Sequence, residues 1–155
     1  MAVKDLKNKG RDLFRRKQYE LAIDAYLEYL RFEPDDEEAT EGLLQAAKKN
    51  RELKGKGLFG GVFKKMGVSA RDPKKRMDQA LRALAKAPEN KGLLMALGAA
   101  ALDSGAMGAA VVAYNQAAEV DPEDSEPFKQ LGMALGRKGR IEEALNALRK
   151  ACEIN

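Results

Sequence analysis

The stretch that decides the fold is KGLLMALGAAALDSGAMGAAVVAYNQAAEVDPED, residues 91–124. It holds two runs of apolar and small residues, Gly92–Leu102 and Met107–Val120, on either side of a turn at 103–106. Within each run the larger apolar side chains recur three and four residues apart, which is the spacing of one helix face. The stretch therefore predicts two helices joined by a tight turn and closed by Pro122.

The same unit recurs along the chain. A first copy precedes the stretch, since Gly10 and Ala22 stand at the same offsets before Pro34 as their equivalents do before Pro122. A fixed period near 34 residues, with a helix–turn–helix pattern inside each period, is typical of a stacked helical array. Small residues occupy equivalent positions 34 residues apart: Gly98 and Gly132, Ala110 and Ala144, and Ala117 and Ala151.

At these residues the chain resembles the tetratricopeptide repeat (TPR) family, from Val3 to Asn155 except for one insertion. The resemblance implies an all-α fold, a right-handed α-solenoid of antiparallel helix pairs in a single domain, residues 1–155. Its four units are expected at about residues 3–36, 37–90, 91–124 and 125–155, with the second interrupted by an insertion at 54–71. Because helix 141–154 keeps apolar residues on its far face, we expect either a fragment of a larger protein or pairing of this end with another chain.

Glycines at one position of the repeat predict close helix contacts. Glycine inside a helix costs about 1 kcal/mol relative to alanine, so a glycine that recurs there indicates that a second helix crosses closely. The glycines are Gly10, Gly98 and Gly132, and the small residues expected on the crossing helix are Ala22, Ala110 and Ala144.

The composition argues against catalysis and against a membrane span. The chain has no His and one Cys, and it offers neither a nucleophile beside a base nor a cluster of metal ligands. We therefore expect no enzyme activity, no metal and no cofactor. There is no run of 18 apolar residues, the N-terminus is charged from Lys4 onward without the apolar core of a signal peptide, and a lone Cys152 fits a reducing compartment. These features predict a cytoplasmic protein.

Positive charge is concentrated around the insertion. Residues 48–76 carry eleven Lys and Arg against two acidic residues, a net charge of +9, whereas the rest of the chain is at −5. Such asymmetry points to an anionic contact. The insertion also contains G-x-G-x-x-G at 55–60, but no strand is expected before it, so we do not predict a nucleotide site.

The insertion is amphipathic when drawn as a helix. Three interpretations stay open: a loop that folds back on its own solenoid, a segment that docks on a partner or a neighbouring copy, and a contact with a membrane surface. The apolar face consists of Leu58, Phe59, Val62, Phe63 and Met66, with Lys64 and Lys65 outside it.

The resemblance also implies a binding surface. In TPR proteins the first helix of each pair lines a concave groove that holds a peptide. Carried over, the groove is basic at its N-terminal end and apolar further on, which suits an acidic peptide with apolar anchors. The alternative is that these positions are merely solvated faces. The candidate positions are Lys4, Lys7, Arg11, Phe14 and Arg15, then Lys48 and Lys49, then Met95, Ala99 and Leu102, and finally Lys129, Met133 and Arg137.

The sequence thus predicts a protein–protein interaction scaffold that binds a partner protein or peptide. One alternative is a peripheral membrane or polyanion-binding adaptor that uses the insertion 54–71. Nucleic acid is the less favoured polyanion, because the basic block lacks an aromatic set for base stacking. Another alternative is a self-assembling scaffold, a homo-oligomer built through the insertion or the apolar face of helix 141–154.

Overall fold

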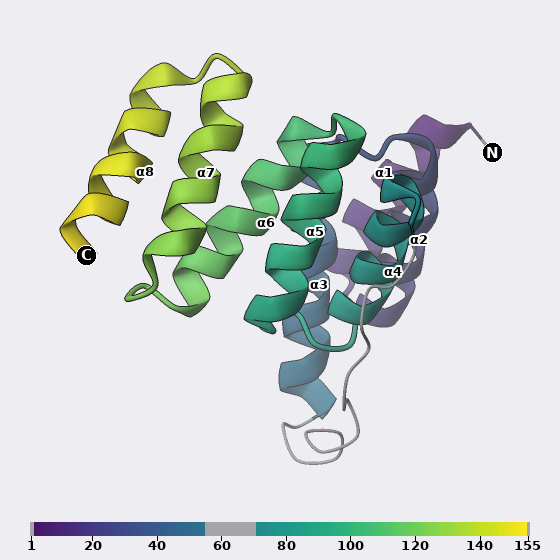
Figure 1. The fold of residues 1–155 in the computed structure, drawn as a ribbon. Helices are drawn as coiled ribbons and strands as arrows, with labels where there is room; N and C mark the ends of the chain where they lie inside the picture. The colour runs from purple at the N-terminus through teal and green to yellow at the C-terminus, as the bar shows by residue number, and fades with distance from the viewer. Residues whose placement is uncertain (1, 55–70, 155) are drawn as a thin grey trace.

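A computed structural model describes residues 2–54 and 71–154, and in these residues every regular element is an α-helix (Figure 1). The N-terminus lies at one end of the array and the C-terminus at the other. The helices are α1 (Val3–Arg15), α2 (Tyr19–Phe32), α3 (Glu37–Lys54), α4 (Pro73–Leu84), α5 (Lys91–Ser104), α6 (Met107–Val120), α7 (Ser125–Arg137) and α8 (Ile141–Ile154).

Three helix pairs form the regular part of the solenoid. Helices α1 and α2, α5 and α6, and α7 and α8 each pack closely on one another as hairpins, and α6 then packs on α7. The predicted α-solenoid of antiparallel helix pairs is confirmed. The two helices expected from residues 91–124 are present, with α5 ending two residues beyond the predicted Leu102.

The second unit differs from the others. Helices α3 and α4, which flank residues 55–70, do not form a closely packed hairpin with each other. Helix α3 packs mainly on α2, and also on α6 and α1, and α4 packs mainly on α5. Helix α3 runs parallel to α6, because Asp35 just before α3 bonds the first turn of α6 and Lys48 far along α3 bonds Gln116 far along α6. Helix α6 is therefore covered on several sides, and ten of its residues are buried.

Three equivalent turns close the pairs α1/α2, α5/α6 and α7/α8. In each, one residue adopts a left-handed conformation, and the next amide donates to the carbonyl five residues earlier, as in a Schellman motif. These donors are Gln18, Ala106 and Arg140. The left-handed residues are Gly105 and Gly139, with φ of 83° and 80°, and Lys17, with φ of 62°.

The glycines inside the helices lie where a second helix approaches, as predicted. A Cβ on Gly98 would stand 2.5 Å from the ring of Tyr114, and a Cβ on Gly10 would stand 2.9 Å from the ring of Tyr26. In the fourth unit a Cβ on Gly132 would meet Leu148 at 2.7 Å. The partner is thus the side chain sixteen residues later in each unit. The expected alanines are all buried, and the carbonyl oxygen of Ala144 lies 3.2 Å from a Cβ placed on Gly132.

Candidate protein-interaction surfaces

The predicted basic end of the groove is neutralised within the chain. Lys7 Nζ lies 2.7 Å from Asp36 Oδ2 and 3.0 Å from Glu38 Oε2, and Arg11 pairs with Glu38. Both carboxylates stand at the start of α3, where the packing of α3 against α1 brings them to the lysine and the arginine. The two cations therefore serve first to join α1 to α3.

The pKa values of these groups follow from the same contacts. Burial opposes the charged form of Asp36, but hydrogen bonds from Lys7, the Ala39 amide and Tyr29 outweigh it and hold the pKa of the carboxyl below its usual range. The hydrogen bonds from Arg11 and Lys7 lower the pKa of Glu38. For Lys7, burial favours the neutral form, yet the bonds to Asp36 and Glu38 raise the pKa of its ammonium. All three groups are charged at neutral pH.

The other predicted residues of α1 and α3 are also mostly engaged. Arg15 lies 3.6 Å from Asp12 on its own helix, and Phe14 packs edge-on against Tyr19, with ring centroids 5.3 Å apart. Lys48 donates to Gln116 Oε1 at 2.6 Å, and Lys49 lies 3.6 Å from Glu52. Lys4 is exposed and forms no ion pair with any residue that the structure describes.

The predicted residues of α5 and α7 form two stripes at the surface. On α5, Ala99 is exposed, while Met95 and Leu102 are half-buried and pack against the core. On α7, Lys129, Met133 and Arg137 follow at four-residue spacing and are all exposed; we call them the α7 stripe. Within residues 2–54 and 71–154, neither Lys129 nor Arg137 has an acidic partner, so their charges are available to another molecule.

The structure does not join all the predicted positions into one row of helices. Helix α3 packs on α1, but α3 and α5 are not among the closely packed pairs, because α3 lies on α6 instead. The positions of α1 and α3 are thus brought together, whereas those of α5 and α7 stand in another part of the array.

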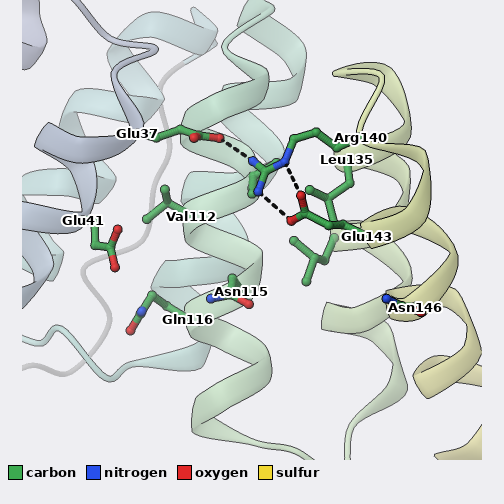
Figure 2. Close-up of a pocket in the computed structure, with 11 residues that line it drawn as sticks. Glu37, Glu41, Val112, Asn115, Gln116, Leu135, Arg140, Glu143 and Asn146 are labelled. Carbon is green, nitrogen blue, oxygen red and sulfur yellow. Dashed lines mark hydrogen bonds and ion pairs between the residues drawn. The ribbon is translucent and has the colours of Figure 1, made fainter.

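A cleft of about 350 Å³ opens between α3, α6, α7 and α8 (Figure 2). Buried apolar side chains of α6 and α7 form its floor, and carboxylates and amides stand around it. The cleft is lined by Glu37, Glu41, Val111, Val112, Asn115, Gln116, Leu131, Leu135, Arg140, Glu143 and Asn146.

Arg140 closes one end of this cleft. It donates to Glu37 at 3.0 Å across the cleft, and to both carboxylate oxygens of Glu143 at 3.0 and 2.6 Å (Figure 2). The hydrogen bonds with Arg140 lower the pKa of Glu143, and those with Glu143 raise the pKa of Arg140. Lys138 adds a contact of 3.6 Å to Glu37. The turn between α7 and α8 is thereby tied to the start of α3.

The sequence did not point to the cleft as a site. The cleft depends on the placement of α3 beside α6, because Glu37 and Glu41 of α3 supply one of its walls. One signal was present: Asn115 and Gln116 interrupt the otherwise apolar run of α6, and Gln116 is only 5% exposed. A buried amide in an apolar helix needs a partner, and Lys48 of α3 supplies it.

Some predictions fall on residues outside those that the structure describes. These are the insertion contacts Leu58, Phe59, Val62, Phe63, Lys64, Lys65 and Met66, and the glycine pattern at 55–60. Among the described residues, no group of three or more acidic or Cys side chains is placed to hold a metal ion. None of the described helices is both long and apolar enough to cross a membrane.

Comparison with known proteins identifies the repeat and the fold. The tetratricopeptide repeat family model matches residues 130–155. A crystal structure of MamA is similar, with a TM-score of 0.51 at 19% identity, over 98% of this chain and 77% of that one. A mutant of MamA gives a TM-score of 0.53 at 15% identity, over 100% and 98% of the two chains. No curated protein matches the sequence.

The predicted resemblance to the tetratricopeptide repeat family is confirmed by the match at residues 130–155. At the identities found, the likeness to MamA shows a shared fold and nothing further. Tetratricopeptide repeats are protein-interaction modules, so the repeat and the solenoid together support a protein-interaction scaffold.

Proposed function

We propose that the protein is a scaffold that holds an acidic segment of a partner protein, with apolar anchors, across α5 and α7. The observation that carries the proposal is the α7 stripe, in which Met133 is 42% exposed and stands between two cations that have no acidic partner among the residues described. From the sequence, the basic part of the groove was expected on α1. Because Lys7 and Arg11 are engaged with α3, the proposal places the available positive charge on α7 instead.

The spacing of the α7 stripe sets the kind of segment that fits. Residues eight positions apart on a helix are separated by about 12 Å along its axis. An extended peptide covers roughly that distance in three to four residues. A carboxylate at every fourth position could therefore reach Lys129 and Arg137 in turn, and an apolar side chain between them would lie on Met133. Methionine suits this role because its flexible thioether adapts to different apolar partners.

Helix α5, the first helix of the neighbouring pair, carries a second group of partly exposed apolar side chains. Met95 and Leu102 are held by the core but keep part of their side chains at the surface, and Ala99 between them has little bulk to obstruct a bound chain. A second apolar anchor of the partner is expected here. Specificity would come from the charges of the α7 stripe, because like-charged segments are repelled.

Fluorescence anisotropy with a labelled peptide tests the proposal. The probe carries Asp at every fourth position with Leu between. We expect the double variant K129E and R137E to bind it at least about tenfold more weakly, because attraction becomes repulsion at both ends.

The matched control reverses two other exposed cations, Lys86 and Arg149, which form no ion pair in the described part of the chain. It changes the net charge by the same amount and should bind nearly as well as the parent. If both double variants bind the peptide equally weakly, the loss of affinity comes from the change in net charge and not from the α7 stripe. Unchanged binding by K129E and R137E would remove the α7 stripe as the site.

A further inference from the structure

The cleft between α3, α6, α7 and α8 lies apart from the α7 stripe and has the opposite charge. Its lining holds Glu37, Glu41 and Glu143 against one cation, Arg140, while Lys138 and Lys48 contact the lining residues Glu37 and Gln116 from outside it. Two of these carboxylates are already satisfied, since Arg140 bonds both Glu37 and Glu143. Glu41 is exposed and forms no ion pair or hydrogen bond within residues 2–54 and 71–154, so it gives the cleft an available negative charge.

The floor of the cleft is apolar and firmly held. Val111, Val112 and Leu131 are each 8–9% exposed, and Leu135 is 3% exposed. These side chains belong to the core and are fixed by the packing of α6 on α7. They offer a preformed apolar surface at the bottom of an opening of about 350 Å³, near the lower end of the roughly 300–1,000 Å³ seen for binding pockets.

Amide side chains stand on two sides of the floor. Asn115 projects from α6 and makes one long hydrogen bond of 3.4 Å to Glu119, and Asn146 on α8 makes none among the residues described (Figure 2). A primary amide can donate and accept at once, so it pairs with the N–H and C=O groups of a peptide backbone. Two such groups facing one opening suit an extended main chain better than a single ion.

Two fixed contacts hold the cleft open. Arg140 spans from the α7–α8 turn to Glu37 at one end, and Lys48 joins α3 to Gln116 further along. Glu41 stands between these two points, one turn after Glu37 on α3. A partner therefore needs no rearrangement of the helices to reach the carboxylate, and little ordering cost is added on binding.

We propose that this cleft is a second protein-interaction site, and that it takes a basic segment in which Arg or Lys stands next to an apolar side chain. The cation pairs with Glu41, the apolar side chain lies on Val112, Leu131 and Leu135, and the backbone bonds Asn115 and Asn146. The two surfaces thus select opposite partners: the α7 stripe an acidic segment, and the cleft a basic one. A scaffold of this kind could hold two different segments at the same time.

The test uses the full chain and a labelled peptide in which Leu and Arg alternate, flanked by Gly and Ser. Anisotropy should show that Glu41→Lys weakens binding about tenfold. Glu41→Gln, which keeps the shape of the side chain, should weaken it roughly threefold. The matched control is Glu89→Lys, because Glu89 is exposed in the α4–α5 turn and forms no ion pair within the described part of the chain. It should leave affinity within the error of the measurement.

Nuclear magnetic resonance gives the location independently of any variant. The side-chain amide signals of Asn115 and Asn146 should shift during titration with the Leu–Arg peptide. The same peptide with Glu in place of Arg should leave them unchanged. The proposal is overturned if Glu41→Lys and Glu89→Lys bind alike, or if both amide signals stay fixed while the Leu–Arg peptide saturates the protein.

Substitutions at one proposed site should not weaken binding at the other. Reversing Lys129 and Arg137 should leave the binding of the Leu–Arg peptide unweakened, and Glu41→Lys should leave the binding of the Asp–Leu peptide unweakened. Loss of both peptides in either variant would contradict two independent sites and indicate a general effect of charge.

Discussion

At the scale of single residues, the contact of Gly98 with Tyr114 sets how closely α5 and α6 approach. Tyr114 is 2% exposed, and its burial raises the pKa of the phenol to about 12, so it stays protonated at neutral pH. An added methyl group at Gly98 would stand 2.5 Å from the ring. We expect Gly98→Ala to lower the free energy of unfolding by about 1–3 kcal/mol, because overpacking forces the helices apart.

Gly136 provides the control for this substitution. It also lies in a helix, α7, but a Cβ there would meet nothing within 4 Å. Gly136→Ala should raise stability by up to about 1 kcal/mol through helix propensity alone. Urea denaturation of both variants distinguishes the effects. If Gly98→Ala were also stabilising, the close crossing of α5 and α6 would be wrong.

Lys17 is the one member of the three equivalent turns that is not glycine. Its φ of 62° places a side chain in the left-handed region, where Gly105 and Gly139 have no Cβ to strain. We expect Lys17→Gly to raise the free energy of unfolding by about 1 kcal/mol, whereas Lys17→Ala, which keeps a Cβ, should bring little gain. Thermal unfolding of the two variants measures the difference, and an equal response would rule out backbone strain at this turn.

Residue-scale features were predictable from the sequence where they repeat. The glycines of the first, third and fourth units were identified by their shared position in the repeat. In each, an added Cβ would come within 3 Å of a side chain on the facing helix. The ion pairs of Lys7 and Arg11 with the start of α3 were not predicted. They join residues 27 to 31 positions apart, and nothing local to α1 indicates which carboxylates the packing brings near.

At the scale of elements, the tie between α3 and α6 has a specific chemical basis. Asp35 Oδ1 accepts from the amides of Gly108 at 2.6 Å and Ala109 at 3.3 Å. It thereby caps α6, whose own first residues supply no side-chain cap. We expect Asp35→Ala to lower stability by about 1–2 kcal/mol, the usual cost of losing a helix cap. Amide hydrogen exchange should become faster in the first turn of α6, more than 70 residues away in sequence.

Asp124 is the control for that change. It caps α7 from the residue immediately before it, by accepting from the Glu126 amide at 3.0 Å. Asp124→Ala also removes a 2.9 Å contact with Lys91 of α5, which keeps Asp121 at 2.8 Å. It should speed exchange in the first turn of α7 and leave the first turn of α6 as well protected as before. If Asp35→Ala left the first turn of α6 as well protected as before, the packing of α3 on α6 would be contradicted.

The helices themselves were more predictable than their partners. Turn residues and caps, such as Pro73 after Asp72 and Gly105 after α5, mark the helix ends in the sequence. The neighbours of α3 are decided by packing, and the regular period that would predict them is broken by the insertion 54–71. The pairing of α3 with α6 could therefore not be inferred from the repeat, and the cleft that depends on it could not be either.

At the scale of the whole molecule, positive and negative surfaces are separated. Lys7 and Arg11 of α1 and Lys48 of α3 join helices, the cations of the α7 stripe have no acidic partner among the described residues, and the cleft presents Glu41. Net charge alone, +4, gives no indication of this arrangement. It follows from which charges the fold pairs internally, and it is the basis of our proposal that one solenoid binds segments of opposite charge at two sites.

The measurement that tests the central claim most directly is a titration with the Asp–Leu peptide, followed through the methyl groups of ¹³C-labelled methionine. Met133 lies in the α7 stripe and Met95 on α5, whereas Met77 is 3% exposed in the core and serves as an internal reference. Binding across α5 and α7 predicts that the Met133 and Met95 signals shift together with one affinity, while the Met77 signal stays in place. If the peptide saturates the protein and the Met133 signal does not move, the proposed binding surface is wrong.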